Sequence, residues 1–420
     1  MNLKNKNLFT WITLALIILM PFYVFLKVLF EHQFQIPYFW VLLKEGLIVL
    51  LTIALVYEFY KARKKPCFEL LDYLIFAYFG YGIAITLFNG LWLSALFHGG
   101  RYDFMFFWVF LILRHGAWFL KISLAQAIRL FVWSGWIALL IGLILKVIGE
   151  EFLTVFGYDF YRWSWVYQWA VPIYHGVESS WIRRFQGLLD GPNQMAFFLF
   201  TYMAAAFYFI KNKFEFHHGC VAIGLFVLLI LTFSRSALLG LVAGVALLVL
   251  LQAKTLFIKY KKQIWAGLVC VAIVFALLLS LFEQKINYIV VRQGSTQGHF
   301  ERMEIGFDRF LEKPWGHGLA TSWPWYRHTN PGPITKQEEK QFIPESWFVQ
   351  QLVEWWVIFF LLFCSILLLI LKGVYHRSMS FFIACVWIGV MNIFLHIFEA
   401  TYMSALLFLF LGLLLAKKYA

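Results

Sequence analysis

Long apolar runs recur along almost the whole chain, and they constrain its fold more than any other feature. Two of them, 217–233 and 236–253, are separated by little more than Arg235. Runs of about 17–25 apolar residues can cross the ~30 Å hydrocarbon core of a bilayer as helices, which satisfy their own backbone hydrogen bonds. The chain is 62% hydrophobic and 14% charged, whereas soluble domains are roughly 25% charged. The sequence therefore predicts an all-α integral membrane protein.

About twelve spans are predicted, in a single polytopic domain that covers residues 1–420. Their connections alternate in composition: one set is short and lysine-rich, as in YKARKKP and KTLFIKYKKQ, and the other mostly has few lysines. By the positive-inside rule the lysine-rich set and both termini are cytoplasmic. The spans are predicted at about 8–29, 37–58, 70–89, 103–120, 123–148, 195–210, 217–233, 236–253, 264–283, 346–371, 379–396 and 399–416.

Two long connections, 150–194 and 284–345, then lie on the outer face, the second between spans nine and ten. Arginines gather on this face, although the positive-inside rule explains only the cytoplasmic lysines. A guanidinium group suits bidentate binding of phosphate or carboxylate. Pairing with outer acids or with lipid headgroups is the alternative. The outer set is Arg101, Arg162, Arg183, Arg184, Arg235, Arg292, Arg302, Arg309 and Arg327.

Arg235, in LTFSRSALLG, is held at the outer rim because the two spans beside it leave almost no loop. A helix N-terminus already favours anions, an arginine there adds to that preference, and Ser234 can cap the helix. An arginine that only snorkels to the interface is the alternative.

The stretch RRFQGLLDGPNQ, from residue 183, leads into the sixth span. Its Arg183 and Arg184 lie just outside the membrane, at the depth of an anionic headgroup. Asn193 fits a helix N-cap, with Pro192 supplying a rigid turn.

The stretch FERMEIGFDRFLEK, from residue 300, predicts a short amphipathic helix on the outer surface, which the turn WGHGL follows. Gly306 weakens this helix prediction. Arg302 and Arg309 are seven residues apart and share a face. The apolar side is formed by Phe300, Met303, Phe307 and Phe310.

Glu345 stands at the start of the tenth span, in FIPESWFVQQLVE. It is either an acid that favours the helix start or a base for a substrate hydroxyl. Glu399, with His396 near it, lies at the turn before the last span, as an orienting residue or as a structural partner for an arginine. The histidines and cysteines lack zinc-site spacing, so no metal and no cofactor are expected.

Together these stretches resemble the bacterial O-antigen ligase and polymerase superfamily, from about residue 180 to about residue 360. The resemblance is carried by Arg184–Gly187–Asn193, by TFSRSALL, by the helix of Arg302 with its WGHGL turn, and by ESWFVQQLVE.

The resemblance implies a glycosyltransferase of the bacterial inner membrane that acts on the outer, periplasmic side. Such enzymes pass a glycan from undecaprenyl diphosphate to lipid A–core, to a growing polysaccharide or to a protein hydroxyl, without a metal or a nucleotide sugar. The family's two essential arginines would be Arg235 and Arg302. Where ligases commonly carry a histidine, this chain has Glu345, so either Glu345 or a loop histidine such as His328 would be the base.

The further residues expected to bind substrate are Arg183, Arg184, Asn193, Arg309, His328 and Glu399. The expected partners are the lipid-linked donor, the glycan or lipid acceptor and membrane lipids. No nucleic acid is expected, because topology explains the net charge of +13. A flippase for the same lipid would need ionisable residues in mid-span and two similar halves. A scaffold protein would not need the outer arginines.

Overall fold

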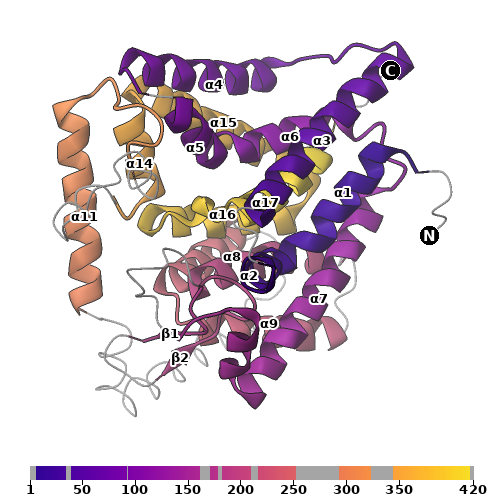
Figure 1. The fold of residues 1–420 in the computed structure, drawn as a ribbon, viewed down its shortest axis with the longest axis vertical. Coiled ribbons are helices and arrows are strands. Elements are labelled where there is room, and N and C mark those ends of the chain that lie inside the picture. Colours follow the sequence, from indigo (N-terminus) through magenta and orange to yellow (C-terminus); the bar gives the residue numbers. More distant parts are fainter. Residues whose placement is uncertain are drawn as a thin grey trace.

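The structure is a computed structural model that describes residues 6–34, 39–91, 93–160, 171–177, 182–209, 216–251, 293–322 and 344–416. Helices account for most of these residues, and one short hairpin joins β1 (His175–Gly176) to β2 (Arg183–Arg184) in antiparallel register. Figure 1 shows the helices packed around α16 and α17, with α11 at the left edge of the view, beside α14.

The elements follow one another along the chain with short connections in the described ranges. They are α1 (Leu8–Leu19), η1 (Met20–Phe22), α2 (Tyr23–Gln33), α3 (Phe39–Ala62), α4 (Leu70–Phe88), α5 (Leu93–Asp103), α6 (Met105–Gly116), α7 (Leu124–Ile148), η2 (Glu150–Phe156), α8 (Pro192–Phe207), α9 (Phe216–Leu231), α11 (Gln293–Glu312), α14 (Trp347–Glu354), α15 (Val357–Arg377), α16 (Met379–Phe394), η4 (Ile397–Glu399) and α17 (Thr401–Leu414). A further helix, Arg235–Leu251, lies between α9 and α11 in sequence.

Four helical segments in the described ranges are long and apolar enough to cross a membrane: Leu8–Gln33, Leu70–Phe88, Leu124–Ile148 and Val357–Arg377. The pair α5–α6, bent by 59°, adds a fifth if it forms one span. Together with the helical fold, these segments confirm the prediction of an all-α membrane protein. The total of twelve stays a prediction, and the predicted ninth span, 264–283, lies outside the described residues.

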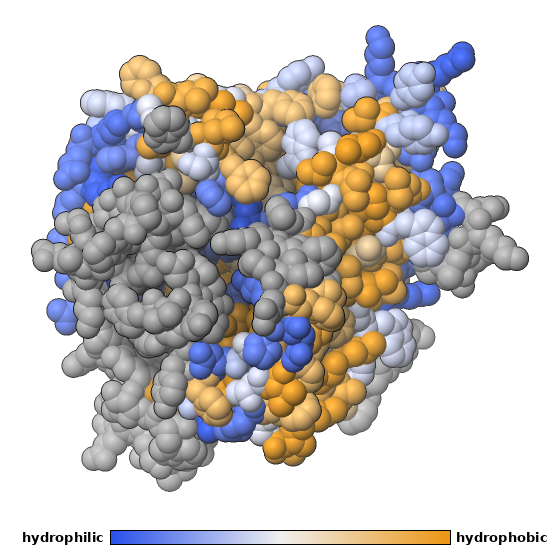
Figure 2. Space-filling view, in the orientation of Figure 1, coloured by the Kyte–Doolittle hydropathy of each residue, from blue (hydrophilic) through white to orange (hydrophobic). Residues whose placement is uncertain are grey.

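Exposed apolar side chains cover the outside of several long helices, as lipid-facing residues do. On α3, Val49, Ile53 and Val56 are each more than half exposed and recur with helical spacing. Figure 2 shows apolar side chains spread over much of the right-hand part of one face.

The predicted tenth span, 346–371, is wrong as a single helix. The chain forms the short helix α14, breaks at Trp355 and Trp356 in extended conformation, and starts again as α15 at Val357. The break is held in place because the Trp355 ring is buried and stacks on Tyr78, with centroids 4.1 Å apart. An apolar run alone does not show where a buried aromatic contact interrupts a helix.

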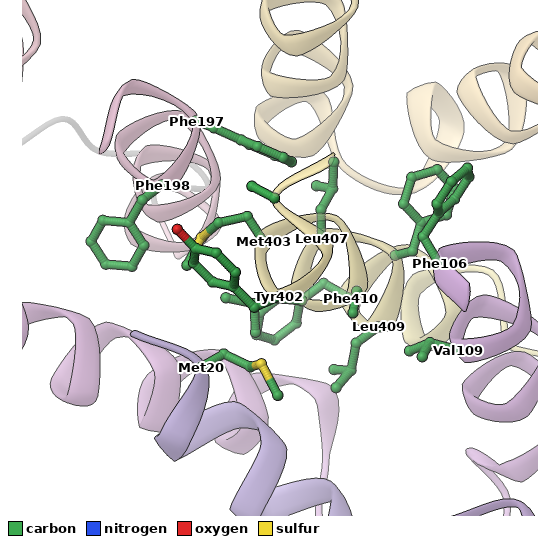
Figure 3. Close-up of a cluster of buried hydrophobic side chains, with 14 of the residues drawn as sticks. Met20, Phe106, Val109, Phe197, Phe198, Tyr402, Met403, Leu407, Leu409 and Phe410 are labelled. Carbon is green, nitrogen blue, oxygen red and sulfur yellow. The ribbon is translucent and has the colours of Figure 1, made fainter. Parts of the chain in front are cut away.

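The core is centred on α17, in which every residue is buried. A helix that is apolar all round is stable only when other elements surround it. Gly412 brings it close to α6, because a Cβ at this position would lie 2.6 Å from the carbonyl oxygen of Phe110. Figure 3 shows the side chains that surround or belong to α17, among them Met20, Phe106, Val109, Phe197, Phe198, Tyr402, Met403, Leu407, Leu409 and Phe410.

The connections predicted for the two sides of the membrane gather at opposite ends of the helices. At one end Asn7 donates to Phe119 O (3.0 Å), and Arg114 donates to Leu415 O (3.1 Å). At the other end Gln33 donates to Val155 O, at 3.0 Å. Each contact joins two segments of the same predicted side, and the partition of all the loops between the two sides stays a prediction.

The predicted amphipathic helix near residue 300 is α11, and it begins at Gln293, seven residues earlier than expected. Gly306 has a structural reason in this helix. A Cβ there would lie 2.6 Å from Val349 Cγ1 and 2.7 Å from Pro344 Cβ. The glycine therefore allows α11 to pack closely on the start of α14, beside Glu345.

Candidate functional site

Arg235 is the first residue of the helix Arg235–Leu251, at the predicted rim position. It follows Phe233, whose φ of +47° turns the chain sharply between α9 and this helix. The Arg235 Nη1 donates to Thr296 Oγ1 of α11 at 2.6 Å. Arg235 therefore points toward the amphipathic helix.

Arg302, on the same helix α11, contacts Glu345 through its Nη1. The second oxygen of that carboxylate, Oε2, lies 2.9 Å from His299 Nδ1. His299 and Arg302 are three residues apart, so they share one face of α11 and hold the carboxylate between them. Two neighbouring side chains of α11 thus bind one acid from the segment before α14.

The backbone of Glu345 has a φ of +50°, a left-handed conformation that is rare for residues other than glycine. Such a conformation persists where surrounding contacts determine it, and it is frequent at functional sites. Here the contacts are the two α11 side chains on one side and Ser346 on the other. Ser346 caps α14 by accepting a hydrogen bond from Val349 N. Glu345 therefore stands just outside α14 and does not serve as its cap.

The charge environment of Glu345 keeps it ionised. Burial raises its pKa, but the hydrogen bond from His299 and the positive charges of His299, His396 and Arg302 outweigh burial and lower the pKa to about 2. A carboxylate with so low a pKa is a weak proton acceptor at neutral pH.

A cavity of about 250 Å³ lies between the start of helix Arg235–Leu251, the N-terminal half of α11 and the chain after α16. It mixes polar groups with apolar walls, as ligand sites do. The residues that line it are Arg184, Asn193, Phe233, Ser234, Arg235, Ser236, Leu239, Thr296, His299, Phe300, Met303, Phe394 and Leu395.

Arg184 and Asn193 line a further side of this cavity. Arg184 donates from Nε to Thr232 O (2.8 Å) and from Nη2 to Asn193 Oδ1 (3.1 Å). The prediction of Asn193 as the N-cap of the sixth span is wrong. Gly191 is the N-cap and Pro192 takes the first helical position, so the Asn193 side chain is left to orient Arg184.

Three predicted substrate-binding residues do not line the cavity. Arg183 points elsewhere, because its Nη1 lies 2.5 Å from Glu151 and its guanidinium stacks over Tyr174. Arg309 donates to Thr321 O from both Nη1 and Nη2, each at 3.4 Å, near the C-terminal end of α11. Glu399 ends η4, with Oε1 buried. His328 lies outside the described residues.

The turn WGHGL fixes the far end of α11. His317 N donates to Val353 O (3.0 Å) and Gly318 N donates to Glu354 O (3.1 Å) at the end of α14. Gly316 has a φ of +98°, and a Cβ there would lie 2.6 Å from the same Glu354 oxygen. The glycines are therefore needed for close contact between two backbones.

Thr296 and His299 were missed as site residues by the sequence analysis. The available signal was spacing, because residues 296, 299 and 302 recur every three positions and lie along one face of a helix. That face could be recognised only with the correct start of α11.

The described residues thus form a helical membrane domain with an arginine-lined cavity at one end of its helices. Residues 220–364 match the family model described as O-antigen ligase. The match includes Arg235, Arg302 and Glu345, and it confirms the predicted resemblance to the O-antigen ligase and polymerase superfamily. This segment of the chain is therefore similar to the O-antigen ligase family. Comparison with curated proteins finds no match.

Proposed function

We propose that this protein transfers a glycan from undecaprenyl diphosphate to an acceptor hydroxyl on the outer side of the bacterial inner membrane. The single observation that supports the proposal most is the convergence of Arg235 and Arg302 on one helix, α11. Arg235 reaches Thr296, and Arg302 is held by Glu345 only six residues further along. Thr296, which Arg235 contacts, and Arg302 lie about 9 Å apart along the axis of α11.

In this reaction the acceptor oxygen attacks the anomeric carbon of the glycan, and the bond from that carbon to the pyrophosphate oxygen breaks. The lipid pyrophosphate leaves with the bonding electrons, so its negative charge grows in the transition state. Arg235 and Arg302 are in position to stabilise this charge, and the partly buried site strengthens their effect. Arg184, fixed by Asn193, supplies a third cation on the cavity wall.

Glu345 was predicted as the base that takes the acceptor proton. Its low pKa and its contact with the Arg302 guanidinium favour a positioning role instead. We assign to Glu345 the task of holding Arg302 and His299 in one orientation.

The test is reconstitution of the purified protein in vesicles that contain an undecaprenyl diphosphate glycan. Lipid A–core, a free glycan chain and an acceptor protein are offered in separate reactions, which separates ligase, polymerase and protein transferase. Transfer to one of them is expected, and Arg235→Ala and Arg302→Ala are each expected to lose about 10²–10³-fold in rate.

The matched control is Arg183→Ala, which removes another arginine of the predicted outer face, one that pairs with Glu151 and does not line the cavity. This variant should keep the wild-type rate. Absence of transfer to every acceptor, or wild-type rates in the Arg235 and Arg302 variants at normal abundance, contradicts the proposal.

A further inference from the structure

Among the described residues that line the cavity, His299 is the one titratable side chain besides the two arginines. The sequence analysis did not predict it as a site residue. It lies on α11 between Thr296, which binds Arg235, and Arg302. Each neighbour is three residues away, which is about 4.5 Å along the helix axis. A group in this place lies between the two arginines that the proposed function assigns to the pyrophosphate.

The ring of His299 is oriented by its contact with Glu345. Nδ1 of the ring lies 2.9 Å from Glu345 Oε2, within ion-pair distance, so the second ring nitrogen, Nε2, is the one that can accept a proton from a substrate. The carboxylate also stabilises the imidazolium ion that forms after proton uptake. A histidine held by a carboxylate in this way is a common arrangement for a general base.

The His299 side chain is more exposed than that of Glu345, as a base that meets the substrate requires. The Glu345 side chain is 17% exposed and the His299 side chain 30% exposed, with His299 on the cavity wall. The carboxylate is thus the inner partner of the pair, and the imidazole is the partner that a substrate in the cavity can reach.

We propose that His299 is the catalytic base of the transfer and that Glu345 is its positioning residue. The inference rests on the proposed function. As the acceptor oxygen bonds to the anomeric carbon, its proton moves to His299 Nε2, and the lipid pyrophosphate leaves with the electrons of the broken C–O bond. The proton then passes from His299 to solvent, so the enzyme returns to its starting state.

The charged groups that face this pair come from every element around it. Glu345 favours the protonated ring, whereas Arg302 on α11 and Arg235 on the neighbouring helix oppose it. Arg184 on β2 adds further positive charge on the cavity wall, and the imidazole of His396, after α16, lies close to Glu345 and His299. The negative charge of a bound pyrophosphate offsets much of this positive charge.

The experiment compares His299→Gln and His299→Ala with the control His32→Gln in the reconstituted system. His32 is an exposed histidine at the end of α2 and does not line the cavity. We expect both His299 variants to lose about 10²–10⁴-fold in transfer rate, as for removal of a general base, while donor binding stays within a few-fold of wild type. The control should keep the wild-type rate.

Two readouts separate a base from a structural residue. Free imidazole should restore part of the transfer in His299→Ala, and the fall in the wild-type rate toward acid pH should be absent from His299→Gln. A His299→Gln rate near that of wild type, or loss of donor binding without rescue by imidazole, overturns the role of His299 alone. Absence of transfer by the wild-type protein overturns the proposed function and this inference together.

Discussion

Arg302, near the middle of α11, and Arg309, near its C-terminal end, lie in different surroundings. Near the N-terminal half, Arg302 binds a carboxylate beside the cavity, and Arg235 from the next helix reaches Thr296. Near the C-terminal end, Arg309 does not line the cavity and donates to the backbone oxygen of Thr321, which follows the WGHGL turn. The comparison teaches that an arginine on the predicted outer face can belong either to the site or to its support, and that tertiary contacts decide between them.

The largest expected difference is between Arg302→Ala and Arg309→Ala. The first removes a cation beside the cavity and should lower the rate of glycan transfer by about 10²–10³-fold. The second removes two long hydrogen bonds to a backbone oxygen and should leave the rate within a few-fold of wild type. Transfer assays at equal protein abundance check this. Equal losses in both variants would mean that Arg302 and Arg309 belong to the same site.

Arg235→Lys tests whether the cavity needs a guanidinium group or only a positive charge. Lysine keeps the charge but lacks the planar fork that binds phosphate through two hydrogen bonds, so we expect transfer to fall by about tenfold or more. Arg309→Lys is the matched control and should behave as wild type. The measurement is the initial rate at saturating donor. Full activity in Arg235→Lys would mean that only charge at the rim matters.

A smaller effect is expected from the packing of α11 on α14. In Gly306→Ala the new Cβ meets Val349 and Pro344, so we expect a loss of about 1–3 kcal/mol in stability and lower transfer, because Glu345 shifts with Pro344. The control is Gly298→Ala on the same helix, where a Cβ meets nothing within 4 Å. That variant should be as stable as wild type or about 1 kcal/mol more stable, since alanine favours helix.

Thermal inactivation of the two glycine variants in detergent provides this measurement. A Gly306→Ala protein that is as stable as Gly298→Ala would show that α11 is not held closely against α14.

The smallest effect concerns acid pH. Although burial raises the pKa of Glu345, His299, His396 and Arg302 lower it to about 2, below the ~4.3 of an unfolded glutamate. A carboxyl group with a lowered folded pKa stabilises the protein above the unfolded value, and this stabilisation is lost as pH falls from about 4.3 to 2. Wild type should therefore lose more thermal stability than Glu345→Gln between pH 5 and pH 3. Parallel losses would show that Glu345 is not ion-paired in the folded protein.

Several features could be predicted from residues alone, because they depend on local pattern. Apolar length predicts the membrane helices, alternating lysine content predicts which connections gather together, and the spacing of Phe300, Met303 and Phe307 predicts an amphipathic helix. The residues of TFSRSALL and ESWFVQQLVE also carried the family resemblance, which the match over 220–364 confirms. These signals lie within single segments, so no fold is needed to read them.

The partners of each polar side chain depended on the tertiary structure. Sequence spacing placed Arg302 and Arg309 on one face, but only packing shows that Arg302 meets Glu345, 43 positions away, and that Arg309 meets the turn after α11. Packing also interrupts the predicted tenth span at a buried tryptophan and places His299 against Glu345. Apolar length and charge bias are properties of a segment, whereas an ion pair is a property of two segments, and only the folded chain brings them together.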